Sequence, residues 1–166
     1  MESSVIDSVM ALQDPSRFVS LSALAKSHLL EVSSLYPGFV RWYQSKVEPG
    51  LLSGERKIIL RASHGRLAGL AVVKMAEERK LCCLRVLPAF QGTGVGVRLF
   101  KHAFEVLGTE HPLLSVADQR LPIFDKVFEY FGFEVGAEYP DLYRANSVEY
   151  SFNGTLLLPN GPGSGG

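Results

Sequence analysis

Cysteine is scarce in this sequence of 166 residues, and the two that are present, Cys82 and Cys83, are adjacent. Two neighbouring thiols are too few for a disulfide framework or for a zinc site built from cysteines. The chain also lacks any run of about 18 apolar residues, so no membrane span is expected. The N-terminal segment MESSVIDSVM lacks a basic region followed by an apolar stretch, and so does not predict a secretory signal. These absences predict a cytoplasmic protein without a membrane partner.

An excess of one charge is also missing, because 17 lysines and arginines balance 17 aspartates and glutamates. Proteins that bind nucleic acid usually carry a basic excess, so nucleic acid is disfavoured as a partner. Hydrophobic residues make up 46% of the chain and charged residues 20%, which suits a folded core rather than a disordered chain. The length predicts a single domain over residues 1–158, followed by a flexible tail rich in Gly, Pro and Ser at 159–166.

Charge is nevertheless uneven along the chain. Ten basic and three acidic residues lie between positions 54 and 102, whereas seven acidic and three basic residues lie between 118 and 150. This asymmetry suggests an anionic ligand over the middle of the chain and a cationic ligand near its C-terminal third. A chance distribution of solvated faces would produce the same pattern, and the sequence does not separate the two interpretations.

Hydrophobic periodicity predicts a mixed α/β (α+β) domain whose strands are mostly antiparallel. Helical spacing marks residues 18–32, 36–47, 94–107 and 121–131. Strand-like runs cover residues 57–62, 67–73, 81–86, 112–117, 133–137 and 147–152. The second helix is expected to end at Pro49-Gly50, and His64-Gly65 is typical of a tight hairpin turn.

A glycine-rich loop, Gln91-Gly92-Thr93-Gly94-Val95-Gly96, lies between a predicted strand and a predicted helix. Free N–H groups at the start of a helix bind anions, and glycines allow a phosphate to approach the backbone closely. The dinucleotide-binding fingerprint would need a further glycine at Val97, and a nucleotide P-loop would need Gly-Lys-Ser or Gly-Lys-Thr. The loop therefore predicts a phosphate site of another kind, with a glycine turn that binds nothing as the alternative.

Together with the strand before it, this loop resembles the GCN5-related N-acetyltransferase (GNAT) superfamily. The match consists of Leu84-Arg85-Val86-Leu87-Pro88 and of Gln91-x-x-Gly94-x-Gly96, and the helix end at 127–133 is also similar to that family. The resemblance covers roughly residues 56–152. It implies a central, mostly antiparallel twisted sheet flanked by helices on both faces, and acetyl-CoA (coenzyme A) as the cofactor.

The resemblance also implies which residues hold the coenzyme. The backbone amides of residues 92–96, with Gln91 at the start of the loop, would bind the pyrophosphate. The backbone of Leu84, Arg85 and Val86 would pair with the pantetheine arm. An N–H at or near Val86 would face the thioester carbonyl and act as an oxyanion donor.

Two positions depart from the pattern of the family. Many members carry an asparagine and a tyrosine on the last helix, where this chain has Leu121 and Phe128. That tyrosine often protonates the leaving thiolate, so the usual general acid is missing. A thiol pKa of about 8.5 leaves the thiolate only about 2 kcal/mol from stability at pH 7, whereas deprotonating an amine requires about 4–5 kcal/mol. Loss of the acid is therefore less damaging than loss of a base would be.

Candidates for the base come from other segments. By the resemblance, Glu31 and Tyr36 border the acceptor site, and Glu149 lies on a closing strand near the acceptor groove. Strand alternation places Cys83 and Arg85 on one face, which in this family commonly looks toward that groove. Arg85 could lower the pKa of the Cys83 thiol and make it a nucleophile, although the favoured interpretation is that Cys82 and Cys83 are small core residues. A carboxylate that acts through water is the favoured base.

The predicted activity is an acetyl-CoA-dependent N-acetyltransferase, in which a primary amine attacks the thioester directly in a ternary complex. The acceptor is an unidentified small-molecule or peptide amine, and no metal is expected. A non-catalytic acyl-CoA-binding or regulatory domain is the alternative, because the usual tyrosine is absent. A narrower alternative is acetylation of aminoacyl-tRNA, which the zero net charge disfavours. Because members of the family are often dimers, a homodimer is a further expectation.

Overall fold

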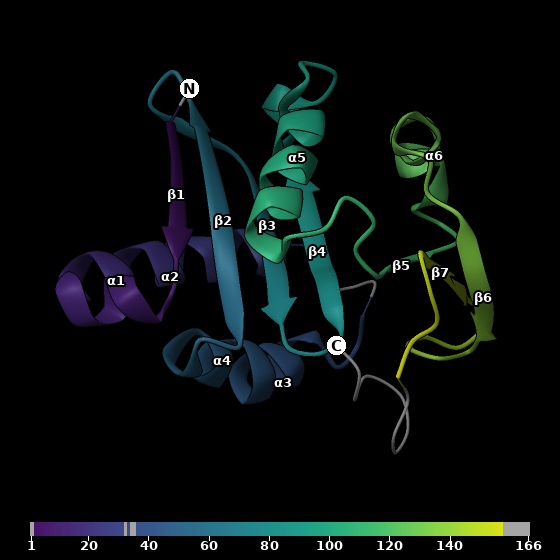
Figure 1. Cartoon of the computed structure of the whole chain (residues 1–166), viewed down its shortest axis with the longest axis horizontal. Helices are drawn as coiled ribbons and strands as arrows, with labels where there is room; N and C mark the ends of the chain where they lie inside the picture. Colours follow the sequence, from purple (N-terminus) through teal and green to yellow (C-terminus); the bar gives the residue numbers. More distant parts are fainter. Residues whose placement is uncertain (1, 32, 34–35, 158–166) are drawn as a thin grey trace.

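The protein, described by a computed structural model over residues 2–31, 33 and 36–157, contains helices packed around two antiparallel sheets (Figure 1). In chain order the elements are β1 (Glu2–Ile6), α1 (Ser8–Gln13), α2 (Pro15–Leu30), α3 (Phe39–Trp42), the π-turn η2 (Tyr43–Val47), α4 (Glu48–Ser53), β2 (Arg56–Ser63), β3 (Arg66–Met75), β4 (Arg79–Val86), the 3₁₀ turn η3 (Pro88–Phe90), α5 (Val95–Leu107), β5 (Leu114–Ala117), α6 (Leu121–Phe131), β6 (Val135–Pro140) and β7 (Val148–Phe152). The expected tail at 159–166 lies outside the described residues. No helix in the described part has the length and apolar character that crossing a membrane requires.

The larger sheet has the strand order β1-β2-β3-β4, and every neighbouring pair is antiparallel. The three strands predicted at 57–62, 67–73 and 81–86 form β2, β3 and β4, which confirms that prediction. His64 and Gly65 join β2 to β3 with φ angles of 52° and 73°, as a two-residue hairpin turn requires. The sequence does not predict β1, which has only two apolar residues. It forms by pairing along the edge of β2, where Ile6 lies opposite Ile58 and is fully buried.

The smaller sheet has the order β5-β7-β6 and is also antiparallel. It meets the larger sheet at a parallel bridge between Lys80 and Leu113, where the Leu81 N–H donates to the Leu113 carbonyl at 2.9 Å. Beyond this bridge β5 pairs with β7 instead of β4, so β4 and β5 diverge. The arrangement confirms the predicted mixed α/β architecture with a mostly antiparallel sheet.

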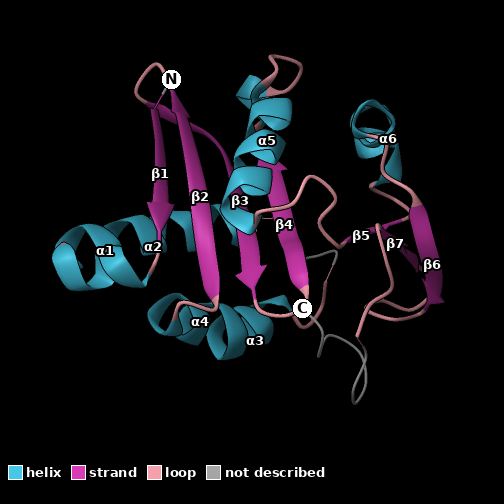
Figure 2. Ribbon diagram, in the orientation of Figure 1, coloured by secondary structure: helices cyan, strands magenta, loops and turns pink. Residues whose placement is uncertain are grey.

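Alternation along the strands of the larger sheet sends neighbouring side chains into two separate cores. Ile59 and Ala71 pack with residues of α5 and α6, whereas Ile58 and Val72 pack with residues of α2, α3 and α4. Figure 2 shows α5 lying across β3 and β4, with α3 and α4 grouped at the lower end of the sheet. Helices therefore cover both faces, as the resemblance implies.

The predicted helix at 36–47 differs from the observed structure in its end and in its regularity. It consists of α3, the π-turn η2 and α4, and it continues to Ser53. The prediction that Pro49-Gly50 ends it is wrong, because Pro49 lies in the first turn of α4, where a missing N–H is tolerated. Gly54 ends the helix instead, in the left-handed conformation with a φ of 87°.

Gly69 in β3 allows α5 to lie close to the sheet. A Cβ at this position would lie 2.9 Å from the Arg85 carbonyl oxygen and 3.2 Å from the Leu99 side chain. We expect Gly69→Ala to lower the free energy of unfolding by about 1–3 kcal/mol, because a backbone oxygen cannot rotate away as a side chain can. Urea denaturation measures the loss.

Gly38→Ala is the control for this substitution. Its φ is −90°, and a Cβ there would meet no atom within 4 Å. We expect the control to keep the stability of the original chain. Equal stabilities for the two variants would show that α5 tolerates displacement from the sheet.

Candidate functional site

A cavity of about 490 Å³ lies where β4 and β5 diverge. Residues 80–84 of β4 and 114–116 of β5 form two of its walls. Side chains of α3 and η2 close one side, and the aromatic rings of Phe100, Phe124 and Phe128 close the other. The cavity therefore reaches from one helical layer toward the other through the opening between the two sheets.

A β-bulge in β4 decides which of its side chains enter each of the two cores. The pairing with β3 shifts between Val72 and Val73, leaving Cys82 as the extra residue. Consequently Leu81 and Leu84 both enter the core beneath α5, whereas Cys82 and Cys83 both pack against the opposite core.

The register of β4 against β3 also sets the direction in which the backbone N–H groups of β4 point. The Leu87 N–H donates to the Ala68 carbonyl of β3 at 2.9 Å. Because N–H groups alternate in direction along a strand, that of Arg85 also points toward β3, and those of Leu84 and Val86 point toward the opening. These two N–H groups face the side on which a ligand could lie along β4, which is where the resemblance would place the pantetheine arm.

The glycine loop forms an open cradle at the start of α5. Gly92 and Gly94 have φ angles of 76° and 84°, and a Cβ on either would meet no atom within 4 Å. Gly94 is the N-cap of α5, and no side chain caps this helix end. The first N–H groups of a helix have no partner inside it, so they and the helix dipole favour an anion here. The loop fits the pyrophosphate of a coenzyme.

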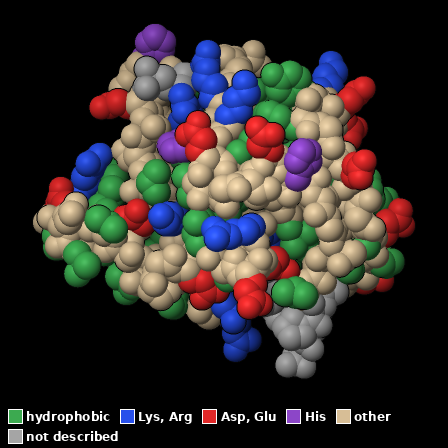
Figure 3. Space-filling model, viewed as in Figure 1, with side chains coloured by type: hydrophobic (Ala, Val, Ile, Leu, Met, Phe, Trp, Pro, Cys, Tyr) green, Lys and Arg blue, Asp and Glu red, His purple; other side chains and the backbone are tan. Residues whose placement is uncertain are grey.

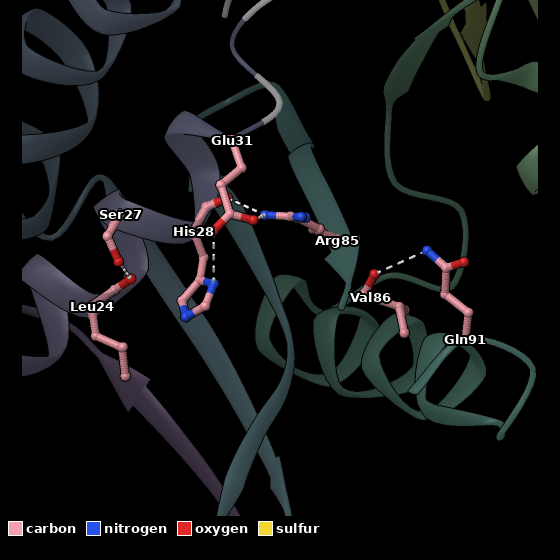
Figure 4. A network of polar contacts seen from close by, with 7 residues as sticks. All are labelled: Leu24, Ser27, His28, Glu31, Arg85, Val86 and Gln91. Carbon is pink, nitrogen blue, oxygen red and sulfur yellow. Dashed lines mark hydrogen bonds and ion pairs between the residues drawn. The ribbon is translucent and has the colours of Figure 1, made fainter. Parts of the chain in front are cut away.

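The side chains around this loop tie it to β4. Gln91 Nε2 donates to the Val86 carbonyl at 3.4 Å (Figure 4), and the Thr93 hydroxyl donates to the Phe90 carbonyl. A Cβ on Gly96 would lie 3.4 Å from Val86 Cγ2, which shows how closely α5 approaches the end of β4. Residues 91–96 do not line the 490 Å³ cavity, and their roles in coenzyme binding stay a prediction.

Glu149 is the buried carboxylate of the cavity. It lies on β7 opposite Ala117 of β5 and is 4% exposed. Burial raises the pKa of this carboxyl to about 7, although a hydrogen bond from Ser115 and the charge of Lys80 oppose the shift. A carboxylate with a pKa near neutrality is suited to accept a proton from a substrate.

Two tyrosines from distant parts of the chain meet beside Glu149. The rings of Tyr36, between α2 and α3, and Tyr143, between β6 and β7, pack edge to face with centroids 5.8 Å apart. Burial, and then the charge of Glu149, raises the pKa of each phenol, so both stay protonated at neutral pH. The resemblance points to Tyr36, but no pattern in the sequence points to Tyr143, which lies in a loop.

Cys83 and Arg85 do not act on one another as the sequence suggests. Cys83 lines the cavity, but burial raises the pKa of its thiol to about 12, which disfavours a thiolate. The Arg85 guanidinium contacts Glu31 Oε2 at 2.7 Å and donates to the His28 carbonyl (Figure 4). It therefore ties the end of α2 to β4 rather than activating the thiol.

Glu31 lies outside the cavity lining, with its side chain 56% exposed. Its contacts are with Arg85 and, at 3.8 Å, with His28 Nδ1. Of the three candidate side chains, Cys83 and Glu149 share the cavity and Glu31 is held apart from it. The catalytic roles of all three, and that of the Val86 N–H, stay predictions.

Phe128 occupies the position where the family often has tyrosine. It is 4% exposed and packs on Phe152, with ring centroids 4.5 Å apart, and it also lines the cavity. The Phe128 side chain has no hydroxyl, so it cannot donate the proton that a tyrosine at this position would donate. Sequence reasoning misses Lys80, Ser115 and Arg120, which the fold brings to the cavity from separate elements.

This chain belongs to the GNAT family of acetyltransferases. A family model described as an acetyltransferase (GNAT) domain matches residues 40–140, more than half of the chain. The resemblance seen in the sequence is thereby confirmed. No sequence among curated proteins matches the chain significantly.

Solved structures share the fold at low sequence identity. A protein from Desulfovibrio desulfuricans assigned to the GNAT family is 18% identical, with a TM-score of 0.62, over 80% of this chain and 90% of that one. A protein from Bacillus anthracis assigned as a streptothricin acetyltransferase, in complex with acetyl coenzyme A, is 19% identical, with a TM-score of 0.52, over 59% and 61%. A Vibrio cholerae spermidine N-acetyltransferase chimera is 16% identical, with a TM-score of 0.51, over 63% and 69%. These likenesses establish the fold.

Proposed function

We propose that this chain, as one domain over residues 1–158, transfers the acetyl group of acetyl-CoA to a primary amine in a ternary complex. The observation that carries the proposal is the buried carboxylate of Glu149 in a cavity between diverging strands. Phe100 of α5, a helix with an uncapped glycine start, lines the same cavity. Family membership and the acetyl coenzyme A bound to the Bacillus anthracis relative support acetyl-CoA as the cofactor.

Each part of the site has a role in this reaction. Residues 92–96 and the start of α5 hold the pyrophosphate, and the free edge of β4 from Leu84 to Val86 aligns the pantetheine arm. Acetyl-CoA supplies an activated acyl group. The Val86 N–H stabilises the oxyanion that develops on the thioester carbonyl. Glu149 accepts the proton of the amine, directly or through water, as the C–N bond forms and the C–S bond breaks.

Glu149 provides what the reaction needs most. Deprotonating an amine with a pKa of about 10.4 requires about 4–5 kcal/mol at pH 7. Releasing the thiol of coenzyme A as an unprotonated thiolate requires only about 2 kcal/mol. A base is therefore more important than an acid. This asymmetry explains how a site with Phe128 at the usual tyrosine position can remain active.

Acetyl-CoA binding and thiol release test the function. We expect millimolar acetyl-CoA to raise the melting temperature, because a ligand that binds only the folded state stabilises it. With a suitable primary amine, free coenzyme A thiol should appear in proportion to acetylated product. Absence of a thermal shift would contradict the coenzyme site. Binding without thiol release from any amine would instead favour an acyl-CoA-binding domain.

A further inference from the structure

The charges that line the cavity are mostly positive. Arg41 of α3, Lys46 of η2 and Arg120 before α6 line it, whereas Glu149 is the one acidic side chain among the described lining residues. Lys80 also lines it, but it is 3% exposed, and burial lowers the pKa of its amine, so it is not counted as a full charge. The overall charge of the chain gives no hint of this excess, since it is zero.

The outer face of the molecule that carries α5 has no such excess. On the outer face that carries α5, side chains of both signs are interspersed (Figure 3). None of the ion pairs within the described ranges involves Arg41, Lys46 or Arg120. These three cations therefore have no acidic partner in the described part of the chain at ion-pair distance, and an anionic ligand would supply one.

Arg120 is the most informative of the three. Its guanidinium is half-buried and lies 5.5 Å from the ring centroid of Phe124, a contact that holds it beside the cavity. It also occupies the N-cap of α6, the positive end of a helix, where a cation is electrostatically unfavourable. Asp118, the nearest acid along the chain, lies outside the lining and accepts hydrogen bonds from Ser147 and the Gln119 N–H. Helix stability does not explain an arginine at this position.

We propose that the acceptor is a small primary amine that also carries an oxyanion group, a carboxylate or a phosphate, which Arg120 binds while Glu149 accepts the proton of the amine. This inference rests on the proposed acetyl transfer and names its substrate class. The two side chains line one cavity but form no ion pair with each other, which leaves room for a molecule that bears both groups. Arg41 and Lys46, which are exposed on the side of α3 and η2, attract the same anion.

Polyamines do not match the charges that line this cavity and should not be preferred acceptors. A polyamine brings several positive charges, and three lining cations would repel it while Glu149 alone would attract it. An amine with a single anionic group matches both signs of charge. The spermidine N-acetyltransferase chimera from Vibrio cholerae shares the fold, and this chain would differ from it in the acceptor.

Matched pairs of amines test the proposal by thiol release with acetyl-CoA. The pairs are amino acids with their amides and O-phosphoethanolamine with ethanolamine, and spermidine is included. We expect kcat/KM for the anionic member of at least one pair to exceed that of its neutral partner about 10- to 100-fold, because a charged hydrogen bond is lost. The amino acid and phosphate arms identify which oxyanion is used. Equal rates within every pair, or preference for spermidine, would overturn the inference alone.

Variants assign the preference to Arg120. Arg120→Gln should bring the ratio of the two kcat/KM values close to one by raising KM for the anionic amine, whereas Arg120→Lys should retain part of it. Arg144→Gln is the matched control, because Arg144 is exposed and lies outside the lining. An unchanged ratio in Arg120→Gln would contradict the role of this residue. Acetyl-CoA binding without thiol release from any amine of the panel would overturn the acetyl transfer, and the inference with it.

Discussion

Gly94→Asp should abolish the thermal stabilisation by acetyl-CoA. Gly94 is the N-cap of α5 and lies in the cradle assigned to the pyrophosphate. A carboxylate about 4 Å from a phosphate charge repels it by about 4 kcal/mol at an effective dielectric constant of about 20, or about 10³-fold in affinity. At about 100 times its Kd, acetyl-CoA adds about 2.7 kcal/mol to the stability of the original chain. That gain corresponds to about 5–10 °C in melting temperature, and the variant should show less than about 1 °C.

Gly108→Asp is the matched control, at the other end of the same helix. Gly94 and Gly108 both have left-handed φ angles, 84° and 73°, and a Cβ on either would meet no atom within 4 Å. The two substitutions therefore introduce the same charge and similar backbone strain. Gly108→Asp should be the less stable variant, because a negative charge at the end of a helix opposes its dipole, yet it should keep the full shift with acetyl-CoA. A normal shift in Gly94→Asp would place the coenzyme elsewhere.

Glu149→Gln should lower kcat about 10²–10⁴-fold, because it removes the proposed proton acceptor and leaves the shape of the cavity nearly unchanged. In the original chain, kcat should rise with pH and level off above about 7, the pKa that burial gives this carboxyl. The rise should be absent in the variant. Initial rates of thiol release at saturating acceptor, measured between pH 5 and pH 9, give both results.

Glu149→Gln should lower the activity but raise the stability of the folded chain at pH 8. The pKa of Glu149 is raised from 4.5 to about 7 on folding, so the folded chain binds a proton more tightly than the unfolded chain. Stability from this group is therefore greatest at low pH, and it falls by up to about 3 kcal/mol as pH rises through this window. Glu149→Gln lacks this loss and should be more stable than the original chain at pH 8, with the difference shrinking toward pH 5. Urea denaturation at the two pH values measures it.

Glu138→Gln is the control for both measurements. Glu138 lies on β6 of the same sheet and is exposed. Glu138→Gln removes the same charge as Glu149→Gln, but it should leave the activity and its pH profile intact. A full loss of activity in Glu138→Gln, or a retained pH profile in Glu149→Gln, would show that another group takes the proton.

Local signals predict most of the fold correctly. The hairpin at His64-Gly65, the start of α5 after Gly94 and its end at Gly108 depend on the left-handed backbone that these turns and caps need. Where local signals compete, prediction fails. Pro49 is read as the end of a helix, yet it lies in a first turn that follows a π-turn, and periodicity does not reveal the π-turn. Pairing with the edge of β2 creates β1, which has little strand character of its own.

The sequence by itself determines the proposed coenzyme cradle, because its backbone geometry and its N–H groups come from consecutive residues, Gln91 to Gly96. Only the tertiary structure decides the proposed acceptor site. Tyr36, Tyr143, Arg120 and Glu149 come from four separate segments, and their charge and pKa depend on what buries them. Burial and Coulomb interactions act through space between distant parts of the chain, whereas turn and cap signals act between neighbours along it.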